Sequence, residues 1–345
     1  MTADSRTPEG RGGSRPTGPR VIAVLCADAH DHAARPGHLQ PLEGLLDWRF
    51  ADADGLAEAV READALLLWD FFSSAVADVW EQAQHVEWIH VAAAGVDKLL
   101  FEELAASDVV VTNARGIFDR PIAEFVAASV FAHAKRVHET HDLQVRRQWL
   151  HRETATLVGK RALIVGTGAI GREIARLLRA LGLQVRGAGS RARAGDPDFG
   201  DVIDSARLAE HVTQLREVDY LVNAAPLTQA TRGLIDAGVL AALKPGAHLV
   251  NIGRGPTVVE ADLLAAVRDG RLDGASLDVF ETEPLPSESA LWDAPGVVVS
   301  PHMSGDVVGW RDALARQFVD NAQRWLAGEE LSNIVDKRLG YVPAG

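Results

Sequence analysis

Ten short apolar runs alternate with longer amphipathic stretches between residues 21 and 300, and this alternation constrains the fold more than any other feature of the chain. The runs, such as VIAVLC from Val21 and RALIVG from Arg161, are continuously apolar and do not alternate with polar residues. Such runs are typical of strands covered by helices on both faces, where side chains on both sides of the strand are buried. The sequence therefore predicts an α/β protein built on doubly wound parallel sheets.

Length and charge narrow the function further. At about 150 residues per domain, 345 residues predict two domains, and a hydrophobic content of 47% can fill two cores. The formal charge of −13 repels polyanions, so we expect no nucleic-acid partner and no anionic membrane partner. No apolar stretch approaches the roughly 18 residues that span a bilayer. We therefore expect a cytoplasmic protein that handles small molecules, preceded by a disordered tail over residues 1–20, where little can be buried.

The stretches between the apolar runs, and the one after the last run, contain residues that are typical of helix starts and ends. A long apolar stretch carries Pro121 in its first turn, where the missing N–H costs nothing, and predicts a buried connector helix over 121–137. A second helix is expected between Gly171 and Gly182, a third over about 258–268, and a last one over about 308–326.

A glycine-rich turn follows the run at Arg161. Gly166, Gly168 and Gly171 form G-x-G-x-x-G between a predicted strand and a predicted helix. The first glycine permits a tight turn, the second lets backbone approach a pyrophosphate, and the third lets helix pack on strand. The helix N-terminus then presents free N–H groups to the phosphates. The turn predicts a dinucleotide-binding site.

The next strand ends in residues that bear on the choice of dinucleotide. NAD-binding chains usually place an acidic residue here for the ribose 2′-hydroxyl, whereas this chain has Ser190, Arg191 and Arg193. A hydroxyl and two guanidinium groups attract a 2′-phosphate that a carboxylate would repel. We expect NADP(H) to be preferred, with NAD(H) possible.

Three ionisable residues follow late strands, in the segments NIGRG, DVFETEP and SPHMSG. Ligands of open parallel sheets bind outside the carboxyl ends of the strands, so Arg254, Glu283 and His302 are expected to meet there. Hydride transfer to a 2-keto acid needs a cation for the substrate carboxylate, a proton donor, and a carboxylate that keeps the donor charged. The three side chains match these roles.

From about Trp88 to Asp336 the chain resembles the D-isomer-specific 2-hydroxyacid dehydrogenases, the glyoxylate/hydroxypyruvate reductases among them. The matching segments, in family order, are HVAAAGVD (90–97), VVVTNARG (109–116), IAEF (122–125), the glycine turn, APLTQATRGLI (225–235), NIGRG, LDVFETEPLP, SPHMSG and SNIVD (332–336).

The resemblance implies a role for further residues. It makes Arg254 the group that binds and polarises the keto acid, Glu283 the partner of the histidine, and His302 the proton donor. The backbone of three residues would hold the substrate carboxylate: Ala94, Gly95 and Val96. Seven residues would line the cofactor: Ala169, Ile170, Ala225, Pro226, Thr231, Ile252 and Asp278 at the carboxamide.

The resemblance also implies two Rossmann- and flavodoxin-like domains, one inserted into the other. The substrate domain would comprise 21–112 plus 305–345, and the dinucleotide-binding domain 113–304. The region 120–158 would join two copies into a homodimer.

Departures from the family pattern bear on the substrate. The strand that ends at Trp69 is followed by Asp70, Phe71 and Phe72, where many members carry basic or small polar residues. This predicts that Trp69 and its neighbours bind an apolar or aromatic substrate tail, and it disfavours phosphoglycerate. Glu283 stands where formate-oxidising relatives carry glutamine, which disfavours that chemistry too. No histidine grouping has metal-ligand spacing, so we expect no metal.

The sequence thus favours an NAD(P)-dependent reductase that converts a 2-keto acid to the D-2-hydroxy acid. The alternative from another class is a dinucleotide-sensing binding protein of the corepressor type, which shares this fold. A binding-only role would tolerate loss of Arg254, Glu283 and His302, and their presence favours catalysis.

Overall fold

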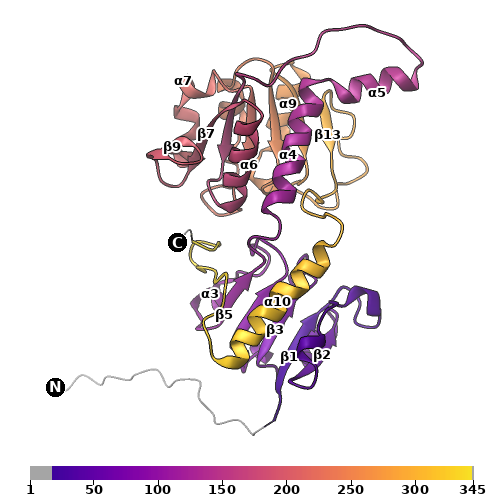
Figure 1. The fold of residues 1–345 in the computed structure, drawn as a ribbon, viewed down its shortest axis with the longest axis vertical. Helices are drawn as coiled ribbons and strands as arrows, with labels where there is room; N and C mark the ends of the chain where they lie inside the picture. The colour runs from indigo at the N-terminus through magenta and orange to yellow at the C-terminus, as the bar shows by residue number, and fades with distance from the viewer. Residues whose placement is uncertain (1–17, 344–345) are drawn as a thin grey trace, which may run out of the picture.

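The computed structural model describes residues 18–343, which contain two β-sheets that follow one another along the longest axis of the molecule (Figure 1). Sheet A has the strand order β2-β1-β3-β4-β5, and all of its pairings are parallel. Its strands are β1 (Arg20–Leu25), β2 (Leu46–Ala51), β3 (Ala65–Leu68), β4 (Trp88–Val91) and β5 (Val110–Asn113). Three short helices accompany it: α1 (Leu56–Ala59), α2 (Ala75–Asp78) and α3 (Glu102–Ala106).

Sheet B has the order β13-β12-β11-β10-β6-β7-β9-β8. Every pairing in it is parallel except that of the edge strand β8, which runs antiparallel to β9. Its strands are β6 (Arg161–Val165), β7 (Gln184–Gly189), β8 (Arg193–Asp196), β9 (Gly200–Asp204), β10 (Tyr220–Asn223), β11 (Ala247–Asn251), β12 (Leu272–Leu277) and β13 (Val297–Val299). The predicted fold class is confirmed.

Helices cover the sheets and connect them. The larger ones are α4 (Asp119–Ala134), α5 (Val137–Val145), α6 (Ala169–Ala180), α9 (Glu260–Arg268) and α10 (Trp310–Ala327), and the short α7 (Val212–Leu215) and α8 (Ala237–Ala242) lie beside sheet B. The predicted connector helix is α4, but it ends at Ala134, before the expected Val137. Arg136, at φ 51°, takes a left-handed conformation that breaks the helix and starts α5.

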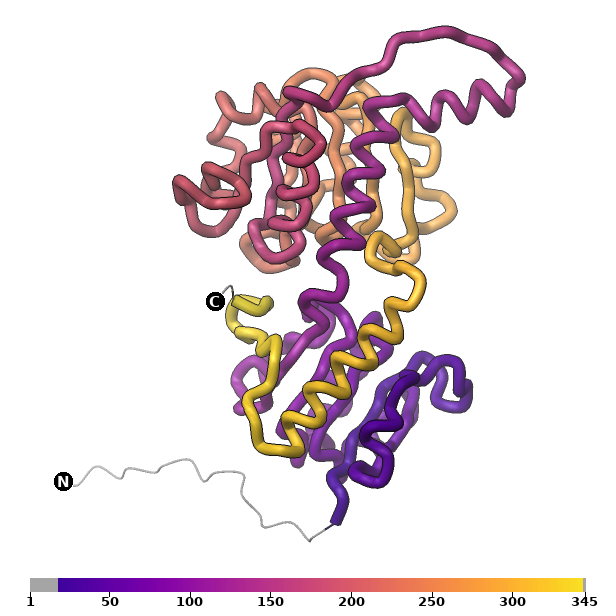
Figure 2. Tube along the Cα trace, viewed as in Figure 1, coloured from indigo at the N-terminus to yellow at the C-terminus, as the bar shows by residue number. Residues whose placement is uncertain are grey.

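The chain passes between the two sheets twice, before α4 and again before α10 (Figure 2). The predicted domain boundaries at 112/113 and 304/305 fall at the end of β5 and between β13 and α10. Beyond the second crossing, α10 returns to sheet A, where the rings of Trp88 on β4 and Phe318 on α10 stack 5.5 Å apart. The last helix therefore shares a core with the first strands, although more than 200 residues separate them in the chain.

The structure corrects the predicted end of the N-terminal tail. Residues 1–17 lie outside the described residues, but the strand β1 already begins at Arg20. The Arg20 guanidinium lies 3.1 Å from the Asp64 carboxylate and 3.2 Å from that of Glu87, which holds this residue against sheet A. Within residues 18–343, no helix is long and apolar enough to cross a membrane.

Candidate active site

The residues predicted to carry chemistry gather at one edge of sheet B. The glycine turn follows β6, Arg254 follows β11, Asp278 follows β12, and His302 follows β13. Because these strands are parallel, their carboxyl ends lie at the same edge. That edge is where the chain crosses to sheet A (Figure 1).

His302 and Glu283 form a hydrogen-bonded pair. The imidazole Nδ1 lies 2.7 Å from Glu283 Oε2, and both side chains are partly exposed. The other carboxylate oxygen, Oε1, accepts the backbone N–H of Phe280 at 2.9 Å. Since Glu283 occupies Nδ1, the ring nitrogen left for a ligand is Nε2.

The electrostatics of the pair favour an ionised Glu283. Burial alone would raise the pKa of the carboxyl, but the hydrogen bonds from His302 and the Phe280 N–H outweigh it and hold the pKa below its usual range. The charge of Arg254 acts in the same direction. A Cβ on Gly255, the residue after Arg254, would fall 1.8 Å from the Phe280 carbonyl oxygen, so this segment packs against the segment that leads to Glu283. The three predicted catalytic residues are thus brought together in the structure.

Asp278 fixes the loop that carries His302. Its Oδ1 accepts from the Ser300 hydroxyl at 2.6 Å and the Met303 N–H at 2.9 Å, and its Oδ2 accepts from the Ser304 N–H at 3.0 Å. Between them His302 stands at φ 53°, a conformation that non-glycine residues seldom adopt. The three hydrogen bonds hold this loop in place.

Arg254 lies against the backbone predicted to bind the substrate carboxylate. A Cβ added to Gly95 would fall 1.7 Å from Arg254 Nη2, so only a glycine leaves room for the guanidinium here. The guanidinium Nε donates to Asp97 Oδ1 at 2.8 Å, and Nη1 donates to the Gly253 carbonyl at 2.8 Å. Ala94 and Val96 flank Gly95 in the loop after β4, and the Asn113 amide holds the Ala94 carbonyl at 2.6 Å.

The glycine turn has the form that a dinucleotide requires. Gly166 has φ 101°, and a Cβ there would meet the Ala224 carbonyl oxygen at 2.5 Å. A Cβ on Gly171 would lie 2.0 Å from the Gly166 carbonyl oxygen, so α6 packs directly on the turn. At Gly168 the space that a Cβ would occupy is open, and a pyrophosphate can approach the backbone there. Ala169 and Ile170 form the first turn of α6, whose N–H groups suit an anion.

The other predicted cofactor contacts lie on neighbouring loops of the same edge. Ala225 and Pro226 follow β10, and the Thr231 hydroxyl donates to the Pro226 carbonyl at 2.6 Å, which closes that loop. Ile252 follows β11, and its N–H bonds to the Asn223 carbonyl at 3.0 Å. Asn223, buried and bonded to Asn251 and Thr257, joins the two loops, although the sequence did not single it out.

The predicted 2′-phosphate residues lie after β7. Ser190 and Arg191 are exposed. Arg193 begins β8, and its Nε donates to Asp196 Oδ2 at 2.8 Å. The buried Asp196 also takes two hydrogen bonds from Arg172 of α6, at 2.9 and 3.0 Å. Arg193 is therefore partly engaged by an acid that the sequence did not single out.

The aromatic loop after β3 meets the catalytic histidine through one ring. Phe72 is 55% exposed, and its ring lies edge-on to His302 with centroids 5.5 Å apart. Phe71 packs between Phe72 and Trp310, at 4.7 and 6.2 Å. Trp69, predicted to contact the substrate, is only 8% exposed and packs in the core beneath the loop. Phe72, and not Trp69, is thus the side chain that the structure places beside His302.

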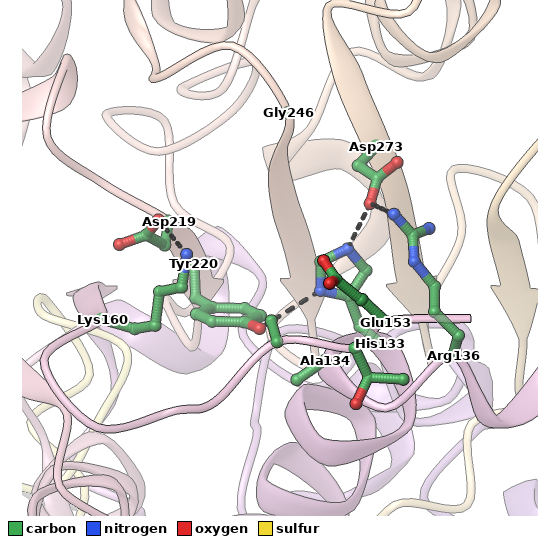
Figure 3. Close-up of a pocket in the computed structure, with 11 residues that line it drawn as sticks. His133, Ala134, Arg136, Glu153, Lys160, Asp219, Tyr220, Gly246 and Asp273 are labelled. Carbon is green, nitrogen blue, oxygen red and sulfur yellow. Dashed lines mark hydrogen bonds and ion pairs between the residues drawn. The ribbon is translucent and has the colours of Figure 1, made fainter. Parts of the chain in front are cut away.

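A cavity of about 360 Å³ lies at the opposite edge of sheet B, near the amino ends of β6, β10 and β11 (Figure 3). Several of its polar side chains bond to one another. His133 bonds to Asp273 at 2.8 Å and to the Tyr220 hydroxyl at 3.2 Å, and Lys160 bonds to Asp219 at 3.2 Å. The catalytic candidates lie across the sheet from it. Within the described residues, no cluster of three or more His, Cys, Asp or Glu side chains could hold a metal ion.

Comparison with known proteins identifies the family. The family model for the NAD-binding domain of D-isomer-specific 2-hydroxyacid dehydrogenases matches residues 127–304, more than half of the chain. The chain belongs to this family. It is an NAD(P)-dependent 2-hydroxyacid dehydrogenase with a nicotinamide dinucleotide as its cofactor, and the resemblance seen in the sequence is confirmed. The open backbone at Gly168 and the N-terminus of α6 fit that cofactor.

Individual relatives span most of the dehydrogenase. Glyoxylate/hydroxypyruvate reductase A of Serratia proteamaculans is 30% identical over 292 residues, covering 81% of this chain and 88% of that protein. The (S)-sulfolactate dehydrogenase of Chromohalobacter salexigens is 33% identical over 238 residues, covering 67% and 75% of the two chains. An NADPH-dependent glyoxylate/hydroxypyruvate reductase from Sinorhizobium meliloti, solved with NADP and sulfate, has a TM-score of 0.80 at 28% identity and covers 94% of this chain and 100% of its own.

Proposed function

We propose that this dehydrogenase reduces a 2-keto acid to the D-2-hydroxy acid, with NADPH preferred over NADH. The observation that carries the proposal is the 2.7 Å pair of His302 and Glu283, placed with Arg254 at the sheet edge where the glycine turn lies. The complete set of acid–base groups favours turnover over a binding-only role of the corepressor type.

Each side chain then has one task. The Arg254 guanidinium binds the keto acid through its free N–H donors and polarises the carbonyl, and the backbone of Ala94, Gly95 and Val96 receives the carboxylate. The cofactor, when bound, supplies the hydride. His302 gives a proton from Nε2 to the nascent alkoxide, and Glu283 stabilises the imidazolium and orients the ring through Nδ1.

The preference for NADPH rests on the charge after β7. Ser190, Arg191 and Arg193 offer a hydroxyl and two guanidinium groups, and no acid takes the ribose-binding position at the end of that strand. The Sinorhizobium relative, by its description, is NADPH-dependent and was solved with NADP, which supports the proposal. NADH remains the alternative cofactor.

Substrate tests decide the reaction. We expect NADPH oxidation with at least one of glyoxylate, hydroxypyruvate, phenylpyruvate and branched 2-keto acids, and a D-hydroxy acid as product by chiral chromatography. An L product, or no oxidation with the whole panel, would contradict the proposal.

The cytoplasmic location stays a prediction from the sequence.

We expect Phe72 to set the size and polarity of the accepted substrate tail. Replacing Phe72 by Ala removes the half-exposed ring beside His302, so phenylpyruvate should lose about 10-fold in kcat/KM relative to glyoxylate. The KM for NADPH should hardly change. Leu45→Ala is a matched control, because Leu45 is equally exposed, at 54%, and lies before β2. An unchanged ranking of keto acids in the Phe72 variant would contradict the assignment.

We propose that the region 120–158 joins two copies into a homodimer. Helix α5 and the loop behind it project from the body of the molecule (Figure 2). They expose large apolar side chains, with Val145 69% exposed, Trp149 100% and Leu150 59%. A second copy with the same surface would bury this patch. Multi-angle light scattering should give twice the chain mass, and Trp149→Glu should shift it toward the monomer. A monomeric wild type would refute the proposal.

A further inference from the structure

An ion pair crosses between the two halves of the proposed active site. Asp97 belongs to the loop after β4 of sheet A, and Arg254 to the loop after β11 of sheet B. The Asp97 carboxylate accepts from Arg254 Nε at 2.8 Å, and both side chains are about three-quarters buried or more. Arg254 and the neighbours of Asp97 have proposed roles in substrate binding, but Asp97 itself has none so far.

The hydrogen bonds of Arg254 engage part of its guanidinium and leave other donors free. A guanidinium has five N–H donors, of which Nε donates to Asp97 and Nη1 gives one to the Gly253 carbonyl. Nη2 lies 1.7 Å from the position that a Cβ on Gly95 would occupy. The free donors therefore lie beside the backbone proposed to receive the substrate carboxylate. Nε beside them is held by Asp97, whose Oδ1 lies 3.0 Å from the same Cβ position on Gly95.

We propose that Asp97 is a positioning residue for substrate binding, because it fixes the Nε of Arg254 and so aims the free Nη donors at the 2-keto acid. The inference rests on the proposed function of Arg254. An arginine side chain has several rotatable bonds, and a charge-assisted hydrogen bond at Nε removes much of that freedom before the substrate arrives. Asp97 lies in the same loop as Ala94, Gly95 and Val96, whose backbone is proposed to bind the substrate carboxylate. Its contact with Arg254 therefore also fixes the guanidinium relative to that backbone.

The negative charge of Asp97 and the hydrogen bond that it accepts from Arg254 have opposite effects on substrate binding. A carboxylate beside the guanidinium weakens the attraction of Arg254 for an anionic keto acid, so a purely electrostatic view predicts that losing Asp97 improves binding. Positioning predicts the opposite. Asparagine at this place separates the two effects, because its side-chain oxygen can still accept from Nε without carrying a charge.

The test compares Asp97→Ala, Asp97→Asn and Lys98→Ala, a control at the exposed neighbouring position. We expect Asp97→Ala to lower kcat/KM for the keto acid about 10- to 100-fold, the range for one charge-assisted hydrogen bond, with the KM for NADPH unchanged within about twofold. Asp97→Asn should retain activity within about fivefold of the wild type, and Lys98→Ala should match it. Calorimetric titration with oxamate, a keto-acid analogue that is not reduced, gives binding apart from turnover, and Asp97→Ala should weaken it in parallel.

A double-mutant cycle with Arg254 distinguishes a positioning role of Asp97 from a purely structural role. In an Arg254→Lys background the amine cannot offer an Nε donor beside Asp97, so adding Asp97→Ala should cost less than about threefold. Equal losses in both backgrounds, tighter oxamate binding by Asp97→Ala, or equal increases in the KM for keto acid and for NADPH would overturn the proposal. Thermal melts show whether a loss reflects unfolding.

If Arg254→Lys alone leaves activity intact, the proposed function fails. If it lowers activity while Asp97→Ala does not, only the positioning role fails.

Discussion

Replacing His302 by Ala should lower kcat by about 10²- to 10⁴-fold, the usual worth of a positioned general acid. The residues proposed to bind the nucleotide lie on other loops, after β6, β7, β10, β11 and β12, so the affinity for NADPH should be preserved. Steady-state kinetics and a separate NADPH titration measure the two quantities. A loss of less than about tenfold would mean that another group supplies the proton.

The pH dependence tests the partner of the histidine. The pKa of Glu283 is held below its usual range, so its carboxylate stays ionised at neutral pH and stabilises the imidazolium. Reduction consumes a proton, so kcat/KM should fall as the pH rises. Glu283→Gln removes the opposing charge, so the fall in kcat/KM should move to lower pH, while keto-acid binding changes less. Superimposable pH profiles for the wild type and the variant would show that Glu283 does not tune the donor.

Features that depend on a few adjacent residues could be predicted from the sequence. The glycine turn is one, because its strand, turn and helix are encoded by consecutive residues and each glycine meets a local steric need. The positions of Arg254 and His302 after strands are another, since parallel strands bring their carboxyl ends to one edge. These two regularities give most of the candidate site.

Contacts between distant residues could not be predicted. Asp97 and Arg254 are separated by 157 positions, and no local pattern reveals that a loop of sheet A meets a loop of sheet B. The burial of Trp69 could not be predicted for a similar reason. The sequence shows a run of aromatic residues but not which of them faces the core, and Phe72 lies at His302 while Trp69 is buried.

The strand β8 is a third case. Its residues Arg193–Asp196 contain no apolar run, so the sequence does not indicate a strand there. The strand is held by the hydrogen bonds of Asp196 to Arg172, Arg193 and the Phe199 N–H. Burial alone would raise the pKa of Asp196, but these hydrogen bonds hold it well below its usual range. A buried, ionised carboxylate thus orders the segment that was expected to meet the 2′-phosphate.

The hydrogen bond between Arg193 and Asp196 affects how much each arginine is expected to contribute to NADPH binding. The double substitution Arg191→Ala, Arg193→Ala should raise the KM for NADPH by about 10²- to 10⁴-fold, since each lost charge-assisted contact costs roughly 1.5–3 kcal/mol. The KM for NADH should change little, because NADH has no 2′-phosphate. Arg193 shares its guanidinium with Asp196, whereas Arg191 is exposed, so Arg191→Ala alone should account for the larger part of the loss.

The matched control is Arg186→Ala, because Arg186 is an exposed arginine of β7 that precedes the ribose-binding end of the strand. It should leave the KM values for both dinucleotides unchanged. If Arg193→Ala alone raises both KM values equally, its pair with Asp196 serves only to hold β8. If the double variant loses NADPH and NADH equally, the two arginines do not read the 2′-phosphate, and the preference for NADPH would have to come from elsewhere in the site.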